Sequence, residues 1–262
     1  MRMKLFKLAM FLLVFATVAG HAQMKVEAFP GKVAGGYDFY LATPETYSRD
    51  AANPVPLVIF LHGRSLCGGR LERARTYGTI HAIDKGRSID ASVLAPHNNG
   101  GAWKPEKIMN TLQWVEENYS VDTNRVSVIG ISLGGYGTLD FVDAYPDKIA
   151  AAMELCGGKS QDTYNGLAQV PLWILHGTAD RAVPISASER VVKGIKNTGD
   201  DTRLIFTRLK GLNHGRPARI FYLKEAYDWL LSHSLKDEGR PVCKDVKIDV
   251  LLINNAYQGL HR

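Results

Sequence analysis

Short apolar segments alternate with amphipathic segments along most of the chain. Eight runs are short, apolar and often β-branched, and most are bounded by Gly, Pro, Asn or Asp, as buried strands are. The predicted strands are residues 25–29, 37–42, 57–61, 92–95, 126–131, 150–155, 172–175 and 204–207. Between the later strands, apolar residues recur at the three- and four-residue spacing of helices. The predicted helices are residues 105–119, 133–144, 186–196 and 218–232.

This alternation predicts the fold class. Strands that alternate with helices form a mostly parallel sheet with helices on both faces. A length of 262 residues, without an internal repeat or a low-complexity linker, suits one domain of the larger sort. The pattern weakens after Lys236: residues 249–254 read as a possible extra strand, and residues 240–262 form a tail of unknown role.

The first residues have the layout of a secretory signal peptide. A basic start is followed by an apolar run over residues 8–18 and by small residues up to Ala22. We therefore expect residues 1–22 to be removed, which leaves a catalytic domain over residues 23–239. A membrane anchor is the alternative, but the apolar run is too short to span a bilayer comfortably. The expected location is periplasmic or extracellular.

The charge of the chain changes when this segment is removed. The net charge is +6, and Arg2, Lys4 and Lys7 contribute three of those charges, so residues 23–262 carry 6 − 3 = +3. The remaining positive charge is dispersed, which gives no indication of a nucleic-acid partner. No other long apolar run is present, so we expect no stable membrane insertion after cleavage. The oligomeric state stays open.

Three cysteines could form one disulfide in an oxidising compartment and leave one thiol over. Cys67 and Cys156 both fall in loops expected near the same edge of the sheet, so their pairing is one hypothesis. Cys243 lies in the tail. The sequence does not determine which pair forms, if any does.

The strongest chemical motif is Gly130-Ile131-Ser132-Leu133-Gly134, which fits G-x-S-x-G. A buried-strand pattern comes directly before it and a helix pattern directly after it. That is the strand–turn–helix context of a nucleophile elbow. We expect Gly130 and Gly134 to leave room for the tight turn and Ser132 to adopt a strained backbone conformation at its tip.

A serine nucleophile needs a base that removes its proton. After an elbow of this type the base follows the serine along the chain, and an acid that lies between the two in sequence orients the base. His214 lies in a Gly-rich loop between the last predicted strand and the last helix, where such a base is expected. Asp180 follows the strand at 172–175 and is the predicted acid, with Asp162 as a weaker alternative. The other histidines fit less well by position: His21, His62, His81, His97, His176, His233 and His261.

An oxyanion hole is expected beside the serine, because the tetrahedral intermediate carries negative charge. The backbone N–H of Leu133 is the first predicted donor. The second should come from residues 62–69, the loop after the strand at 57–61, with the N–H of Arg64 preferred and that of Ser65 as the alternative.

Together these residues resemble the α/β-hydrolase superfamily over most of the chain, and within it small secreted esterases related to feruloyl esterases, polyhydroxybutyrate depolymerases and dienelactone-hydrolase-like proteins. The resemblance implies an α/β-hydrolase fold and an Asp180–His214–Ser132 triad. After Gly63 the chain departs from relatives that have a glycine run or Gly-Glu-Arg. The matching segments are Phe60-Leu61-His62-Gly63, residues 121–126, residues 130–135, His176-Gly177-Thr178-Ala179-Asp180 and Val183-Pro184.

The space between the strands at 150–155 and 172–175 bears on the substrate. Only residues 156–171 separate them, which leaves no room for a large cap and predicts an open site. Trp103 lies in a loop at the expected edge of the site, where it could stack on a substrate or pack the loop down. Tyr136 and Arg181 are further candidate substrate-binding residues.

These observations favour an exported serine hydrolase that cleaves carboxylic esters through an acyl-enzyme. An open site suits a bulky or carbohydrate-linked ester substrate, as for a feruloyl or acetyl esterase. Two alternatives remain: a serine peptidase on the same fold, and a non-catalytic carbohydrate-binding homologue. We expect neither a metal ion nor an organic cofactor.

Overall fold

The structure is a computed structural model that describes residues 24–49 and 52–261. The predicted signal peptide, residues 1–22, therefore lies outside the described residues. Across the described ranges, none of the helices combines the length and the apolar character needed to cross a membrane.

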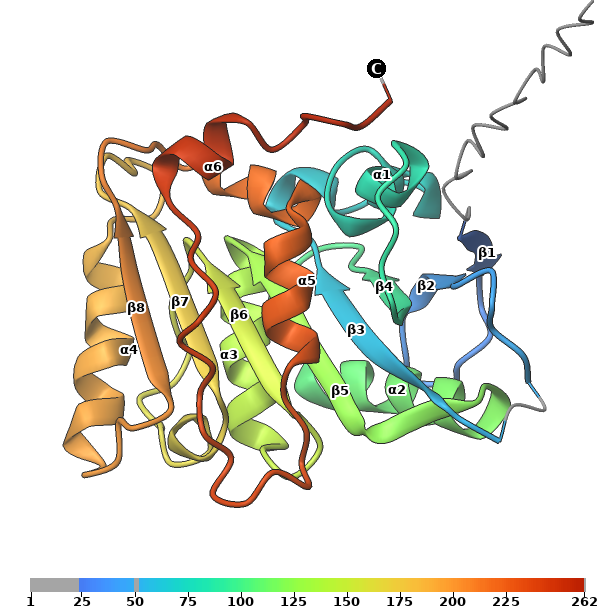
Figure 1. The fold of residues 1–262 in the computed structure, drawn as a ribbon, viewed down its shortest axis with the longest axis horizontal. Coiled ribbons are helices and arrows are strands. Elements are labelled where there is room, and N and C mark those ends of the chain that lie inside the picture. Colours follow the sequence, from blue (N-terminus) through green and yellow to red (C-terminus); the bar gives the residue numbers. More distant parts are fainter. Residues whose placement is uncertain (1–23, 50–51, 262) are drawn as a thin grey trace, which may run out of the picture.

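One sheet of eight strands runs through the molecule, in the order β1-β2-β4-β3-β5-β6-β7-β8 (Figure 1). The six strands from β4 to β8 in that order are parallel, and β1 and β2 complete one edge with antiparallel pairing. All eight predicted strands are confirmed, and five of them are two to five residues longer than predicted. They are β1 Lys25–Phe29, β2 Asp38–Thr43, β3 Val55–Leu61, β4 Ser92–His97, β5 Val121–Ile131, β6 Ala151–Leu155, β7 Leu172–Gly177 and β8 Leu204–Leu209.

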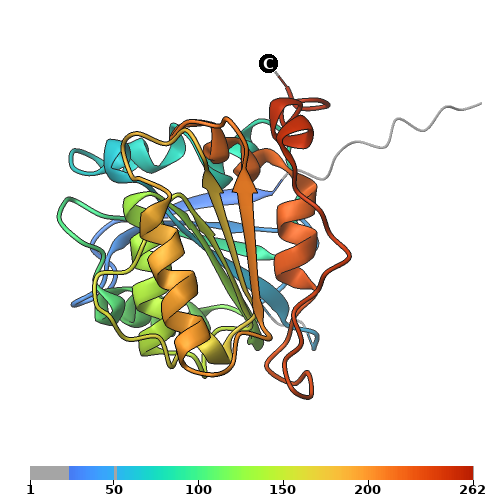
Figure 2. The ribbon, with the colours of Figure 1, turned by 90° about the vertical axis from the view of Figure 1, so that its left-hand side faces the viewer.

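Helices cover both faces of this sheet, as predicted, and each face has its own apolar cluster (Figure 2). Helices α2, α3 and α4 contribute side chains to one cluster, and α1, η4, α5 and α6 to the other. The helices are α1 Thr79–Asp84, α2 Pro105–Asn118, α3 Leu133–Ala144, α4 Ser186–Asn197, α5 Lys224–Leu231 and α6 Val250–Asn254. Short 3-10 turns are η1 Arg64–Leu66, η2 Leu71–Arg75, η3 Leu167–Gln169 and η4 Arg216–Tyr222.

The single helix predicted over residues 218–232 is wrong, because it is two elements. Leu223 adopts an extended conformation, with φ −88° and ψ 132°, between η4 and α5. A continuous helix would bond the Phe221 carbonyl to a backbone N–H four residues on. Here the Tyr227 hydroxyl donates to that carbonyl instead, at 2.6 Å. The break is stable because a buried side chain satisfies the group that it frees.

The extra strand predicted at residues 249–254 is also wrong, because this segment forms helix α6. The carboxylate of Asp249 accepts a hydrogen bond from the Leu252 N–H at 2.8 Å, which caps the first turn. In a strand, Leu251 and Ile253 would share one face. In α6 they point apart: Leu251 is 71% exposed and Ile253 is fully buried.

The tail packs onto the face that carries α5 (Figure 1). The Trp229 indole N–H donates to the Cys243 carbonyl at 2.9 Å, and the Cys243 N–H donates to His233 Nε2 at 3.0 Å. Val242 and Ile253 add buried side chains to the cluster on this face. The tail to which the sequence assigned no role therefore covers part of the core.

This packing predicts different effects for two substitutions in α6. We expect Ile253→Ala to lower the free energy of unfolding by roughly 2–4 kcal/mol, since it leaves a cavity in the core. Leu251→Ala removes an exposed side chain from the same helix, and we expect a change within about 0.5 kcal/mol. Urea unfolding of both variants measures the difference. Equal values for the two would contradict the docking of the tail.

Candidate active site

Ser132 stands at the turn between β5 and α3 with φ 57° and ψ −119°, a conformation that costs energy for a residue with a side chain. Two glycines make the turn possible. A Cβ at Gly134 would collide with the Leu61 carbonyl, and one at Gly130 would collide with the Gly134 carbonyl. The Ser132 N–H donates to the Leu155 carbonyl at 2.8 Å, which ties the turn to β6.

Three predicted site residues meet at this turn. Ser132 Oγ lies 2.9 Å from Nε2 of His214, and Nδ1 of His214 lies 2.6 Å from Oδ2 of Asp180. The other carboxylate oxygen, Oδ1, accepts the N–H groups of Ala182 and Val183, both at 2.9 Å. The structure thus brings Ser132, His214 and Asp180 into one hydrogen-bonded line.

Asp162, the alternative acid, lies elsewhere. It is exposed, and its carboxylate accepts a hydrogen bond from the Tyr164 hydroxyl at 3.0 Å. No hydrogen bond between Asp162 and His214 occurs within the described residues. The geometry therefore selects Asp180 as the partner of His214.

The charge on Asp180 follows from its surroundings. Burial opposes ionisation, but the hydrogen bonds from His214 and from the Val183 and Ala182 N–H groups outweigh it and hold the pKa of Asp180 below its usual value. Asp180 is therefore ionised at neutral pH. An ionised carboxylate only accepts, so Nδ1 of His214 carries the proton and Nε2 is free to accept from Ser132 Oγ.

The two preferred oxyanion donors lie beside Ser132. Leu133 begins α3 and Arg64 begins η1, so both N–H groups belong to first turns, where helices leave N–H groups unpaired. Within the described chain, neither N–H donates to another backbone group. Both residues line one cavity together with Ser132, and Ser65, the alternative donor, lines it as well.

Buried and half-buried side chains hold the loop after β3, residues 62–69, in place. The Tyr77 hydroxyl accepts the Gly63 N–H at 2.9 Å, and the Trp103 indole N–H donates to the His62 carbonyl at 3.2 Å. The His62 ring bridges the backbone: Nδ1 donates to the Gly63 carbonyl at 2.9 Å, and Nε2 accepts the Asn98 N–H at 3.0 Å. This ring is neutral, because burial lowers the pKa of His62 to about 4.

The expectation that Trp103 stacks on a substrate is wrong. Its side chain is only 2% exposed and packs against the rings of Tyr37 and His62, each at 5.0 Å between centroids. The indole fits because Gly137 faces it: a Cβ there would lie 2.6 Å from the Cβ of Trp103. Trp103 therefore packs its loop down, which was the other interpretation of this residue.

The cavity over Ser132 has a volume of about 830 Å³. Tyr136, a candidate substrate-binding residue, lines it, whereas Arg181 is exposed and does not belong to the lining. The segment between β6 and β7 forms a loop with only η3, so no large cap covers the cavity. The lining residues are Gly63, Arg64, Ser65, Tyr77, Ile131, Ser132, Leu133, Tyr136, Ala182, Val183, His214, Gly215 and Ala218.

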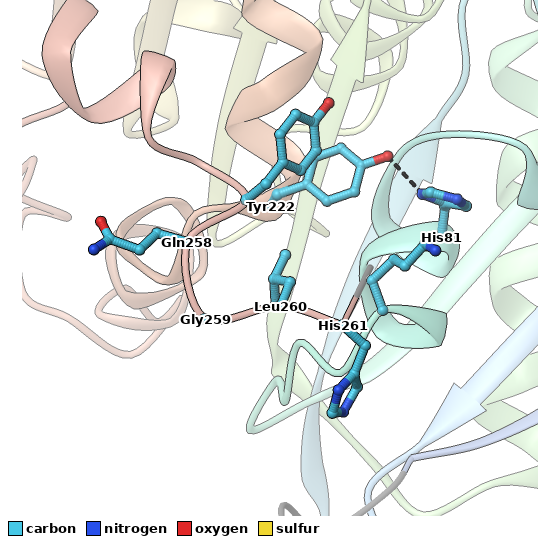
Figure 3. Close-up of a pocket in the computed structure, with 8 residues that line it drawn as sticks. His81, Tyr222, Gln258, Gly259, Leu260 and His261 are labelled. Atoms are coloured by element: carbon cyan, nitrogen blue, oxygen red, sulfur yellow. Dashed lines mark hydrogen bonds between the residues drawn. The ribbon is translucent and has the colours of Figure 1, made fainter.

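A second cavity, of about 570 Å³, lies between α1 and the end of the chain (Figure 3). Tyr222 and His81 form one wall, with Nδ1 of His81 and the Tyr222 hydroxyl 2.8 Å apart. Residues 258–261 form the other wall. Ser132, Asp180 and His214 do not line this cavity, so it is separate from the candidate active site.

The proposed disulfide between Cys67 and Cys156 is absent, because all three cysteines are free thiols in the described residues. Cys156 is buried behind the site, and burial raises the pKa of its thiol. Cys156, His176 and Asp180 place one potential metal ligand each within 4.8 Å of one another. The thiol is protonated and the other two groups are already hydrogen-bonded, so this set does not suit a cation.

Sequence reasoning missed a buried polar group behind Asp180. It comprises Glu154 on β6, Ser188 on α4 and His176 on β7, all fully buried. His176 was set aside because it ends a strand. A visible signal was Glu154, whose carboxyl interrupts the apolar strand Ala151–Leu155, since a buried carboxyl needs specific partners.

The sheet order, the elbow and the Ser132–His214–Asp180 line define an α/β hydrolase. The family model of the dienelactone hydrolase family matches residues 39–215, more than half of the chain. The protein therefore belongs to the dienelactone hydrolase family.

Two curated relatives are esterases by name. A bifunctional acetylxylan esterase/xylanase of Neocallimastix patriciarum is 25% identical over 171 residues, which are 62% of this chain and 24% of that protein. A probable acetylxylan esterase A of Neosartorya fischeri is 31% identical over 85 residues, which are 32% of this chain and 23% of that protein. The chain thus spans about a quarter of the length of these relatives.

Solved structures share the fold at low sequence identity. A thermostable esterase has a TM-score of 0.64 and 22% identity, with 81% of this chain and 63% of that chain covered. A ferulic acid esterase has a TM-score of 0.62 and 15% identity, with 80% and 98% covered.

The burial of His62 predicts how the free energy of unfolding depends on pH. The pKa of His62 is about 4 in the folded protein, against 6.5 without burial, which is the value expected in the unfolded chain. As the pH falls, the unfolded chain therefore binds the proton first. We expect this residue to contribute on the order of 3 kcal/mol that is present above pH 6.5 and lost between pH 6.5 and 4.

Urea unfolding at pH 7.5 and pH 4.5 measures this effect in the wild type and in His62→Gln. The variant cannot take up a proton, so we expect its stability to fall less between the two pH values. Other buried histidines titrate in both proteins and cancel in the comparison. An equal fall in both proteins would show that His62 does not carry the effect.

Proposed function

We propose that this protein is an exported serine hydrolase that cleaves carboxylic esters through an acyl-enzyme. One observation carries the proposal: the line from Asp180 through His214 to Ser132, with the serine hydroxyl at the floor of an open cavity. A non-catalytic homologue has no need for a strained serine that is hydrogen-bonded in this way.

The geometry supports a specific sequence of steps. His214 Nε2 takes the proton of Ser132 Oγ as that oxygen attacks the ester carbonyl carbon, and the carbonyl oxygen becomes an oxyanion. The Leu133 and Arg64 N–H groups stabilise the oxyanion. His214 then gives its proton to the leaving alcohol as the acyl-enzyme forms. A water molecule then attacks the acyl-enzyme in the same way, with His214 as the base, and the carboxylic acid product is released.

An ester substrate fits the cavity better than a peptide with a free amine. Most of the lining is apolar or backbone, and no Asp or Glu is among the described lining residues to bind an ammonium group. The absence of a large cap suits an ester on a bulky or carbohydrate alcohol. The relatives named acetylxylan esterase and the ferulic acid esterase structure favour an acetyl or feruloyl group.

Export is part of the proposal and rests on the sequence of residues 1–22. We expect the mature protein to begin near Gln23. N-terminal sequencing of the protein recovered outside the cytoplasm would identify the new terminus, and a mature chain that still begins at Met1 would refute export by cleavage.

The proposed activity predicts the effect of Ser132→Ala. Substrates are p-nitrophenyl acetate, butyrate and octanoate, together with methyl ferulate. We expect the wild type to hydrolyse at least one and Ser132→Ala to lose roughly a thousandfold or more in turnover, because the nucleophile is gone. A fully active Ser132→Ala would refute the mechanism. Faster cleavage of peptide anilides than of esters would favour the peptidase.

Asp180→Asn and its matched control Asp162→Asn extend the experiment. Asp180→Asn removes the charge that holds the tautomer of His214 and is expected to cost orders of magnitude in kcat. Asp162→Asn changes an exposed carboxylate outside the hydrogen-bonded line and should retain wild-type rates. Loss of activity in both variants would show that the hydrogen bond to His214 does not distinguish the catalytic acid from Asp162.

A further inference from the structure

Polar contacts continue behind Asp180. Nε2 of His176 lies 3.3 Å from Asp180 Oδ2, the same oxygen that accepts from His214. Nδ1 of His176 lies 2.7 Å from Ser188 Oγ, and Ser188 Oγ lies 3.2 Å from Oε2 of Glu154. Glu154, His176 and Ser188 come from β6, β7 and α4, and their side chains are fully buried, as is that of Asp180.

The acceptors around His176 determine where its proton sits. Nε2 is 2.9 Å from the Val183 carbonyl, which can only accept a hydrogen bond. Nε2 must therefore carry a proton, and the same nitrogen lies 3.3 Å from Oδ2 of the ionised Asp180. Burial lowers the pKa of His176, so the ring is neutral and Nδ1 has no proton. Nδ1 accepts from the Ser188 hydroxyl.

The single hydroxyl proton of Ser188 then fixes the state of Glu154. Ser188 Oγ also lies 3.3 Å from the Gly157 carbonyl, but its one proton points at His176, the shorter contact at 2.7 Å. Toward Glu154, Ser188 Oγ can therefore only accept, and a carboxyl that donates is protonated. Oε1 of Glu154 accepts the Gly157 N–H. Burial raises the pKa of Glu154 to about 8, which agrees with this assignment. The chain therefore runs in one direction, from Glu154 through Ser188 and His176 to Asp180.

A reversed chain would also satisfy every group, but it requires a Glu154 carboxylate and a His176 imidazolium. That arrangement buries two additional charges, which burial disfavours. The remaining ionisable groups near Glu154 add no charge at neutral pH, since burial raises the pKa of Tyr136 on α3 and of Cys156 after β6.

We propose that Glu154, Ser188 and His176 form a buried positioning chain that fixes the N–H of His176 Nε2 within 3.3 Å of Oδ2 of Asp180, beside the hydrogen bond from His214. The proposal rests on the proposed function of Asp180 as the catalytic acid. The positive end of this N–H offsets part of the charge of the carboxylate. His214 therefore experiences a weaker negative potential than it would beside an unassisted carboxylate, and its imidazolium is less stabilised.

The protonation pattern can be tested without any enzyme activity. We would label the histidines of the full protein with ¹⁵N and record long-range ¹H–¹⁵N spectra from pH 6 to 9, with His176 assigned through its substitution. We expect a proton on Nε2 and none on Nδ1 at pH 7. Between pH 7 and 9 the Nδ1 signal should shift as Glu154 ionises and the Ser188 hydroxyl turns toward the carboxylate.

Glu154→Gln is the decisive variant in this measurement. Its amide donates to Ser188 at every pH, so the shift of His176 Nδ1 between pH 7 and 9 should disappear. Ser186→Ala, an exposed serine in the same helix α4, is the control and should titrate as the wild type does. A proton on Nδ1 at pH 7, or a Glu154→Gln that titrates like the wild type, would overturn the chain.

Two substitutions of His176 by amide side chains test the effect on His214. Glutamine can place its N–H₂ where Nε2 of His176 lies, whereas asparagine reaches only the position of Nδ1. We expect His176→Asn to raise the acid-limb midpoint of kcat/KM for p-nitrophenyl acetate by about half a pH unit or more, and His176→Gln to stay near the wild type. Thermal unfolding of both variants is the check that they fold.

The outcomes separate this inference from the proposed function. Equal midpoints in all three proteins, with only a common loss of kcat, would reduce His176 to a packing role and overturn the positioning chain. An active Ser132→Ala would overturn the triad instead, while the ¹⁵N result on His176 would stand.

Discussion

The close approach of α3 to the sheet is the constraint on which the candidate site depends. The turn at Ser132 exists only because the glycines on either side of it have no Cβ to collide with the Leu61 and Gly134 carbonyls. The same contact brings the first turn of α3 beside the loop after β3. The serine hydroxyl and both preferred oxyanion donors therefore take their positions from one steric condition, and the strain at Ser132 is maintained by the packing around it.

Polar groups behind and beside this turn are buried or half-buried, and they are paired with one another. On one side, His62, Tyr77 and Trp103 hold the backbone of the loop after β3. On the other, Asp180 receives two backbone N–H groups and lies between two histidines. In a low-dielectric interior, partly satisfied groups of this kind would be costly. Their mutual pairing restricts both the loop and the carboxylate to one arrangement before a substrate arrives.

The strands and the candidate triad could be predicted because their signals are local. A run of apolar β-branched residues predicts a buried strand, and the chain order of Ser132, Asp180 and His214 places each after a particular strand. The predictions failed where contacts between residues far apart in the sequence outweigh the local pattern. Three apolar residues at 251–253 suit either a strand or a helix, and the Asp249 cap together with burial of Ile253 decides for α6. Trp103 was ambiguous because Gly137, which makes room for its ring, is remote in sequence.

The sequence by itself determined the class of fold and the nucleophile elbow, and it limited the candidate base and acids to a few residues, because periodicity, glycine spacing and chain order are properties of a linear string. Only the tertiary structure decided between Asp180 and Asp162, placed Trp103 in the core, left the cysteines unpaired and joined Glu154, Ser188 and His176 behind the carboxylate. Those outcomes depend on distances between residues that are brought together by packing of the sheet and its helices. Hydrogen bonds and van der Waals contacts act over a few ångströms in space, whatever the separation along the chain.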